Sequence, residues 1–131
     1  MIEDKLIGSK DEVEVCQYIK RDVPEAQNLA GRTTISELIK LMQQSHALIG
    51  NDSGAIHMAA AAGLPTVAIF GPTTLSLGYR PWSDNAVVVQ KSLDCRPCSA
   101  HGTRNCPLKT HACMLEINSS EVINAFRILD V

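Results

Sequence analysis

The amino-acid sequence predicts an α/β fold in which helices flank a parallel β-sheet. Short apolar runs occupy residues 47–50, 66–70 and 86–90, and two of them are apolar almost throughout. Runs without alternation are typical of parallel strands that are covered on both faces. The order strand, helix, strand over residues 46–70 is that of a βαβ unit. We therefore expect a Rossmann-like sheet of about four strands.

Helix-start signals support this fold class. A short polar residue followed three positions later by Glu forms a capping box, in which the two residues satisfy each other's free N–H groups. A further helix is expected over residues 54–62, with Gly63 as its C-terminal signal and Pro65 preventing its resumption. Ser9 and Glu12 open a predicted helix that runs to about Arg21. The boxes of Thr34 with Glu37 and Asn118 with Glu121 each precede a run with helical apolar spacing.

Length and composition restrict the class of protein. The chain has 131 residues, of which 45% are apolar, and we expect one globular domain over residues 1–131. A formal net charge of −2 argues against a nucleic-acid partner. No apolar run approaches the ~20 residues that cross a bilayer. The first residues lack the apolar stretch of a signal peptide, so we expect a cytoplasmic protein.

Basic residues are concentrated in one stretch of this acidic chain. They belong to either a solvated loop or a face that meets an anionic substrate or a membrane surface. The bases of this stretch are Arg80, Lys91, Arg96, Arg104 and Lys109.

A polar turn between a predicted strand and a predicted helix is the main candidate site. Asp52, Ser53 and Gly54 follow the first apolar run, and His57 comes one helical turn later. N–H groups at a helix start lack intrahelical partners and face the positive end of the helix dipole, so they can hold a phosphate. Asp52 can accept hydrogen bonds from sugar hydroxyls. The turn predicts a site for a sugar diphosphate; the alternative is a simple helix cap.

A second turn follows the next strand. Gly71, Pro72 and Thr73 come directly after the run 66–70. Because ligands of such sheets bind outside the carboxyl ends of the strands, we expect both turns to lie side by side on one rim. The alternative is a plain turn in which Pro72 fixes φ.

Four of the five cysteines lie close together in the sequence, at Cys95, Cys98, Cys106 and Cys113. The first pair has the spacing of a metal-binding hairpin, and the four thiols are candidate ligands of a structural zinc ion. His101 and His111 are further candidates. Free thiols and a disulfide are the alternatives.

Three blocks together resemble glycosyltransferase family 9, the bacterial lipopolysaccharide heptosyltransferases. They occupy residues 28–34, 51–61 and 67–73, and the first begins Asn-Leu-Ala-Gly. The resemblance implies the C-terminal, donor-binding half of a two-domain type-B enzyme. The Cys-rich loop 92–113 would then be an insertion before the final strand or helix. The N-terminal half, with the catalytic base and the site for a lipid-linked saccharide acceptor, would be missing.

The resemblance also implies roles for individual residues. Contacts with the nucleotide-sugar donor would come from Asn28, Asp52, Ser53, Gly54, Ala55, His57, Gly71 and Thr73. The reaction implied is inverting transfer without a required cofactor, in which His57 stabilises the leaving diphosphate. None of these residues would be the catalytic base, so this chain alone should be inactive.

The sequence thus predicts the donor half, for ADP-heptose, of a transferase of lipopolysaccharide core synthesis. Such an enzyme would work in the cytoplasm, at the inner face of the bacterial inner membrane, with peripheral membrane contact. The alternatives are another nucleotide-sugar transferase or epimerase half, and a non-catalytic zinc-bearing binding module.

Overall fold

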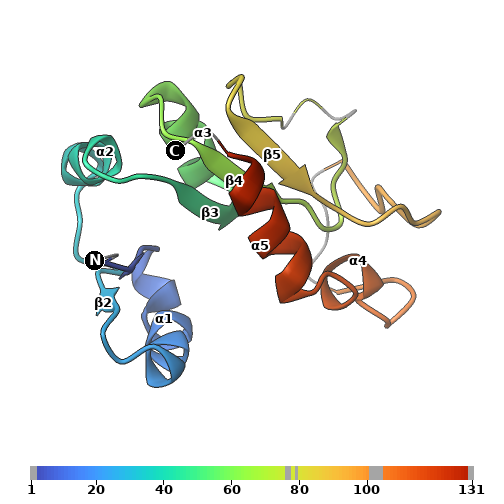
Figure 1. Ribbon diagram of the computed structural model, residues 1–131. Coiled ribbons are helices and arrows are strands. Elements are labelled where there is room, and N and C mark those ends of the chain that lie inside the picture. Colours follow the sequence, from blue (N-terminus) through green and yellow to red (C-terminus); the bar gives the residue numbers. More distant parts are fainter. Residues whose placement is uncertain (1–2, 76–77, 79, 101–104, 130–131) are drawn as a thin grey trace. The chain divides into compact units, whose positions relative to one another are not determined.

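The computed structural model describes residues 3–75, 78, 80–100 and 105–129. The chain divides into two units, Met1–Lys40 and Leu41–Val131. Each unit is described by itself below, with the element labels of Figure 1.

The first unit is a small βαβ arrangement. Strand β1 (Lys5–Leu6) and strand β2 (Gln27–Asn28) pair in parallel, with Leu6 opposite Asn28. A 3₁₀ turn, η1 (Lys10–Glu12), and helix α1 (Val13–Asp22) connect them. The sequence pattern did not predict β2, because Gln-Asn carries neither apolar alternation nor β-branched side chains.

The predicted capping box at Ser9 is wrong. The Ser9 hydroxyl donates to the Glu12 carboxylate at 3.3 Å and makes no capping bond to the described backbone. The chain therefore enters α1 through a 3₁₀ turn, in which the Glu12 N–H bonds the Ser9 carbonyl at 3.0 Å.

The second unit contains the predicted parallel sheet. Among the described residues it consists of β3 (Leu48–Asn51), β4 (Thr66–Ile69) and β5 (Ala86–Val89), in that spatial order. Both neighbouring pairs are parallel and in simple register, so that Leu48 and Ala86 flank Thr66 on either side. The α/β class and these strand positions are confirmed.

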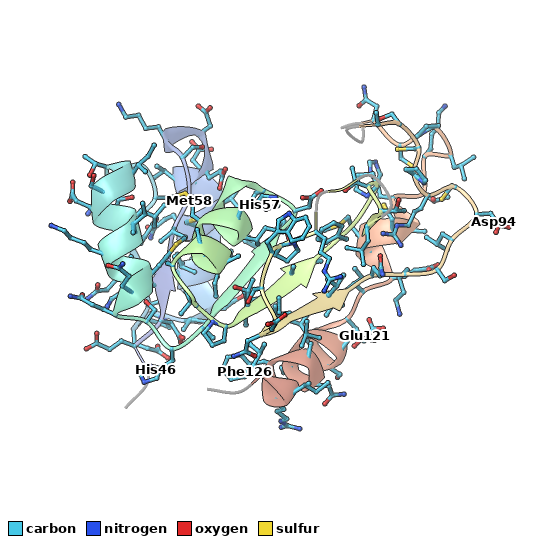
Figure 2. The ribbon with its side chains drawn as sticks, turned by 90° about the horizontal axis from the view of Figure 1, so that it is seen from above. His46, His57, Met58, Asp94, Glu121 and Phe126 are labelled. Atoms are coloured by element: carbon cyan, nitrogen blue, oxygen red, sulfur yellow. The ribbon has the colours of Figure 1, made fainter. Side chains whose placement is uncertain are left out.

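Helices cover both faces of this sheet, as Figures 1 and 2 show for the second unit. Helix α3 (Gly54–Ala61) packs on one face, where Ile56 meets Ala68 and Phe70. Helix α5 (Ser119–Ile128) packs on the other face, where Ala125 meets Val67. Successive residues of β4 thus point to opposite layers, which explains why its sequence is apolar without alternation.

The remaining helix signals are confirmed. The Thr34 and Asn118 boxes form both of their reciprocal bonds and open α2 (Ile35–Gln43) and α5. Helix α3 is terminated just before Gly63, which adopts a left-handed backbone conformation with a φ of +75°. The N–H groups of Gly63 and Leu64 bond the carbonyls of Ala60 and Ala59, which is a Schellman motif.

Residues 91–118, called the Cys-rich segment below, have little regular structure. Their described part contains the short helix α4 (Ala112–Leu115), which is followed by α5. None of the described residues from 91 to 118 is buried. Across the described residues, no helix combines the length and apolar character that crossing a membrane requires.

Candidate functional site

The first half of the candidate site is the turn between β3 and α3. Ser53 is the N-cap residue of α3 in an extended conformation, and its hydroxyl makes no capping bond to the described residues. Ser53 and Gly54 are exposed. A methyl group built on Gly54 would meet no described atom within 4 Å, apart from its chain neighbours and its own helix backbone. The first amides of a helix have no intrahelical partner, and those after Ser53 lie at this exposed helix start, as the phosphate-site prediction requires.

The second half is the turn after β4, residues 71–73, and it lies beside the first. The buried Thr73 hydroxyl donates to Oδ2 of the Asp52 carboxylate at 2.6 Å. The Asp52 N–H also bonds the Ile69 carbonyl at 3.0 Å. The predicted side-by-side position of the two turns is thus confirmed. Residues 52–54 and 71–73 are called the carboxyl rim below.

Arg96 connects the Cys-rich segment to the carboxyl rim. Its guanidinium donates to the carbonyls of Gly71 at 2.6 Å and Thr73 at 2.7 Å. It also bonds the Lys91 carbonyl and the Gln90 side chain just after β5. The planar, five-donor guanidinium suits this convergence of acceptors. Arg96 therefore holds the ends of β4 and β5 together.

Sequence reasoning missed this role and placed Arg96 among the bases of a charged face. The acceptors are mostly backbone carbonyls, which every residue carries, so no side-chain pattern marks them. The only available signal was indirect. Backbone carbonyls at the ends of two adjacent strands need hydrogen-bond donors when they are shielded from water, and a nearby arginine can supply them.

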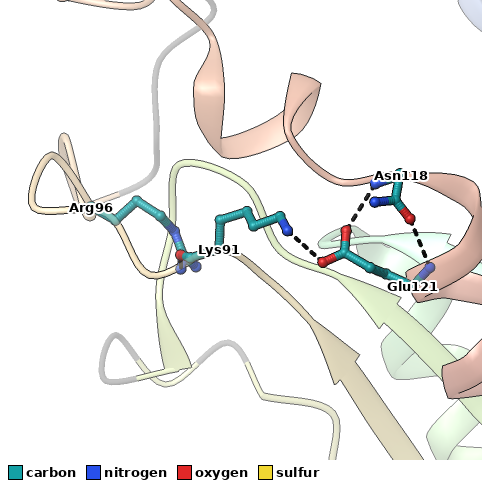
Figure 3. Close-up of polar contacts among 4 residues, drawn as sticks. All are labelled: Lys91, Arg96, Asn118 and Glu121. Atoms are coloured by element: carbon teal, nitrogen blue, oxygen red, sulfur yellow. Dashed lines mark hydrogen bonds and ion pairs between the residues drawn. The ribbon is translucent and has the colours of Figure 1, made fainter.

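A second polar contact joins the end of β5 to helix α5. Lys91 forms an ion pair with Glu121, whose other carboxylate oxygen accepts from the Asn118 N–H at 2.9 Å (Figure 3). The hydrogen bond from Lys91, followed by that from Asn118, lowers the pKa of Glu121. Lys91 and Arg96 thus have partners within the second unit, whereas Arg104 lies outside the described residues.

The helix that follows the turn carries two more predicted residues. His57 lies on the first turns of α3, and its exposed imidazole makes no hydrogen bond or ion pair with the described part of the chain (Figure 2). Ala55 is half-buried beside it. The donor-contact roles of the predicted site residues stay predictions.

Asn28 belongs to the first unit and is engaged there. Its amide nitrogen is within 3.3 Å of the Val13 carbonyl and 3.4 Å of the Gln17 side chain. Its oxygen accepts from the Ala30 N–H at 3.1 Å. Asn28 thus fastens β2 to α1, and it also lines a cleft of about 340 Å³ in this unit.

The four clustered cysteines line one pocket of about 310 Å³ in the second unit. All five cysteines of the chain are described, and none of them forms a disulfide. Within the described ranges, no group of three or more His, Cys, Asp or Glu side chains is arranged to hold a metal ion. The other residues lining the pocket are Pro72, Arg96, Pro107, Leu108, His111 and Met114. His101 lies outside the described residues.

The thiols of this pocket differ in acidity. Hydrogen bonds from the backbone of His111 and Thr110 lower the pKa of Cys106 to about 7. Burial raises the pKa of Cys113, and the neighbouring charges of Cys106 and Cys95 raise it further. The second effect requires the thiols to lie near one another, in agreement with their common pocket.

The parallel sheet, its two helical layers and the open amides at its carboxyl edge define an α/β protein of the Rossmann-like class. The sequence model of glycosyltransferase family 9 (heptosyltransferase) matches residues 5–109. The chain belongs to this family, which confirms the resemblance noted in the sequence.

Similar proteins agree with this assignment. The chain is 38% identical over 121 residues to lipooligosaccharide heptosyltransferase 2 of Campylobacter jejuni, covering 88% of this chain and 37% of that protein. It thus spans little more than a third of that relative. A crystal structure of a family 9 glycosyl transferase from Veillonella parvula matches with a TM-score of 0.74 and 22% identity, over 95% of this chain and 35% of that one. The structure of E. coli ADP-heptose lps heptosyltransferase II matches with a TM-score of 0.64 and 24% identity, over 93% of this chain and 37% of that one.

Proposed function

We propose that this chain is the donor-binding part of an inverting heptosyltransferase of lipopolysaccharide core synthesis, with ADP-heptose as donor. The observation that carries the proposal is the carboxyl rim, where the open N-terminus of α3 lies beside the Asp52–Thr73 pair. Membership of family 9 and the similarity to heptosyltransferases support it. The similarity to the E. coli ADP-heptose enzyme supports the choice of nucleotide.

The diphosphate of the donor would bind at the start of α3. There the unpaired amides after Ser53 supply partial positive charge, and the Ser53 hydroxyl supplies a further donor. Gly54 leaves the space that a phosphate group needs next to the backbone. This arrangement requires no metal ion at the diphosphate, so we expect donor affinity to be the same with and without Mg²⁺.

Asp52 would bind the sugar and not the phosphates, because two negative groups in contact repel each other. Its Oδ2 accepts from Thr73, which orients the carboxylate and leaves Oδ1 to accept from a sugar hydroxyl. Thr73 thus acts through Asp52, which differs from the direct donor contact expected for Thr73 from the sequence.

In the transfer step the acceptor hydroxyl would attack the anomeric carbon from the face opposite the diphosphate. The glycosidic bond to the diphosphate breaks, and the leaving group gains negative charge. The α3 amides and the exposed His57 imidazole would stabilise that charge, which is electrostatic catalysis by preorganised donors. The base and the lipid-linked acceptor site would lie in a part of the enzyme outside this chain. The chain alone would then bind donor without transferring sugar.

The two glycines at the ends of α3 give a direct test. Gly54→Ala places a methyl group in the space proposed for the diphosphate, where it strains no described contact. We expect donor affinity, measured by titration calorimetry, to fall about tenfold or more, which is ~1.4 kcal/mol, with an unchanged or higher Tm.

Gly63→Ala is the matched control at the other end of the helix. Its φ of +75° disfavours a side chain, so stability should fall by about 1–2 kcal/mol while donor affinity stays constant. Wild-type affinity in Gly54→Ala would contradict the proposed site. Tighter binding of a UDP- or GDP-sugar than of ADP-heptose would favour another nucleotide-sugar transferase or an epimerase half.

A further inference from the structure

We propose that Cys95, Cys98, Cys106 and Cys113 together bind one Zn²⁺ ion, which fixes the Cys-rich segment against the carboxyl rim. The first pair has the two-residue spacing that recurs in thiolate zinc sites. Soft thiolate sulfur selects zinc over Mg²⁺ or Ca²⁺. The observations that support this metal centre do not rest on the function proposed above.

The four thiols come from positions that span most of the Cys-rich segment, yet they line a single pocket. Cys16, the remaining cysteine, is buried in α1 of the first unit. None of the four pocket cysteines forms a disulfide, and all four are half-exposed.

Among the described residues of the Cys-rich segment, no hydrophobic core surrounds these thiols. None of the described residues between 91 and 118 is buried, and α4 spans a single turn. Lys109 and His111 also hold left-handed backbone conformations, with φ of +58° and +49°. Such conformations persist where other contacts impose them. Segments that cannot bury enough apolar surface commonly use a structural metal ion instead.

The Cys-rich segment contacts the carboxyl rim closely. A methyl group on Gly71 would come within 2.4 Å of the Met114 sulfur and 3.8 Å of the Cys113 sulfur. The Cys98 N–H bonds the Pro72 carbonyl at 3.4 Å, and Arg96 between the first two cysteines bonds the rim carbonyls. An ion that ties these cysteines together would therefore also immobilise the turn that carries Thr73.

The four thiols line the pocket, but the described side chains are not arranged as a finished ligand set. Zinc–sulfur bonds are about 2.3 Å long, so the four side chains must move inward and the pocket must contract when the ion binds. Metal binding should consequently be coupled to ordering of the segment and should raise the thermal stability of the chain.

The test begins with the metal content of the full chain, prepared under reducing conditions with zinc present. We expect one zinc per chain by mass spectrometry of the metal. Replacement by Co²⁺ should give the visible absorption of a tetrahedral thiolate site. Zinc should also raise the Tm and protect the pocket thiols from a thiol-specific reagent, a measurement that needs no variant to fold.

Variants then identify the ligands. Cys98→Ser and Cys106→Ser should lose the stoichiometric ion. His111→Ala, which changes another residue lining the same pocket, should retain it, as should Cys16→Ser. The proposal is overturned by a chain that binds no zinc and whose thiols react equally with and without it. Iron with acid-labile sulfide, or a native disulfide in this segment, would overturn it as well.

Discussion

The sheet β3–β4–β5 and the Cys-rich segment that follows it are held by different kinds of contact. Val67, Ala68 and Phe70 are fully buried between α3 and α5, so the sheet is stabilised by apolar surface removed from water. The described part of the Cys-rich segment buries no residue and is fastened by Arg96 to backbone carbonyls. The carboxyl rim lies where these two regions meet.

The two halves of the carboxyl rim therefore depend on different contacts. The apolar layers place Asp52 and the start of α3, since both follow directly from β3. The position of residues 71–73 depends in addition on polar contacts from the Cys-rich segment, which are directional and individually breakable. Substitutions in the two regions should therefore have different effects on stability and on donor affinity.

The largest contrast should come from truncating one apolar side chain in each region. Phe70 is 0% exposed and Leu115 is 76% exposed. Phe70→Ala should lower the free energy of unfolding by about 3–5 kcal/mol, because it removes buried surface and leaves a cavity. Leu115→Ala should change it by less than ~0.5 kcal/mol. Urea unfolding of both variants measures the difference, and comparable losses would show that the segment has a core of its own.

The next contrast lies within one strand-helix unit and concerns catalysis. His46 and His57 are both exposed, but His46 precedes β3 whereas His57 follows it on α3 (Figure 2). In the complete enzyme, His57→Ala should lower kcat by about 10²–10³, because a donor to the leaving diphosphate is lost. His46→Ala, at the amino edge of the sheet, should leave kcat unchanged. Equal rates for the two variants would remove His57 from the mechanism.

Much of the sheet region could be predicted from its sequence. The apolar runs placed the strands to within a residue or so, and the topology of parallel strands placed both polar turns on one rim. The ligand contacts of those turns stay predictions.

Other features were not predictable for physical reasons. Strand β2 is two residues long and is defined by pairing with β1, a contact that no local pattern encodes. The Ser9 box failed because the serine and glutamate side chains bond each other. Arg96 was missed because its principal acceptors are backbone carbonyls more than twenty positions away.

Substitution of Arg96 tests how strongly its polar contacts hold the Cys-rich segment on the carboxyl rim. Arg96→Ala leaves the Gly71 and Thr73 carbonyls without these partners and should cost about 1–3 kcal/mol of stability. Arg96→Lys should recover little of this, since an ammonium group cannot reproduce the guanidinium fork. The exposed Arg127 on α5 is the matched control, and Arg127→Ala should stay within ~0.5 kcal/mol.

Donor affinity measured on the same Arg96 variants sharpens this result. If the guanidinium positions the turn that carries Thr73, affinity and stability should fall together in both variants. A lysine variant that behaves like the wild type would mean that the positive charge, and not the geometry of the fork, is what the rim requires.

The smallest effect should come from Glu121, which joins α5 to the end of β5 through Lys91. The folded-state pKa of this carboxyl is lowered, chiefly by the Lys91 hydrogen bond. Its contribution to stability is therefore present above the unfolded-state pKa and is lost as the pH falls through the folded-state value. Glu121→Gln keeps a side chain suited to the capping box but removes the charge. Its Tm should lie slightly below that of the wild type at neutral pH, and the two should converge in acid. A difference that persisted in acid would instead assign the effect to the cap, because protonation abolishes the ion pair in the wild type.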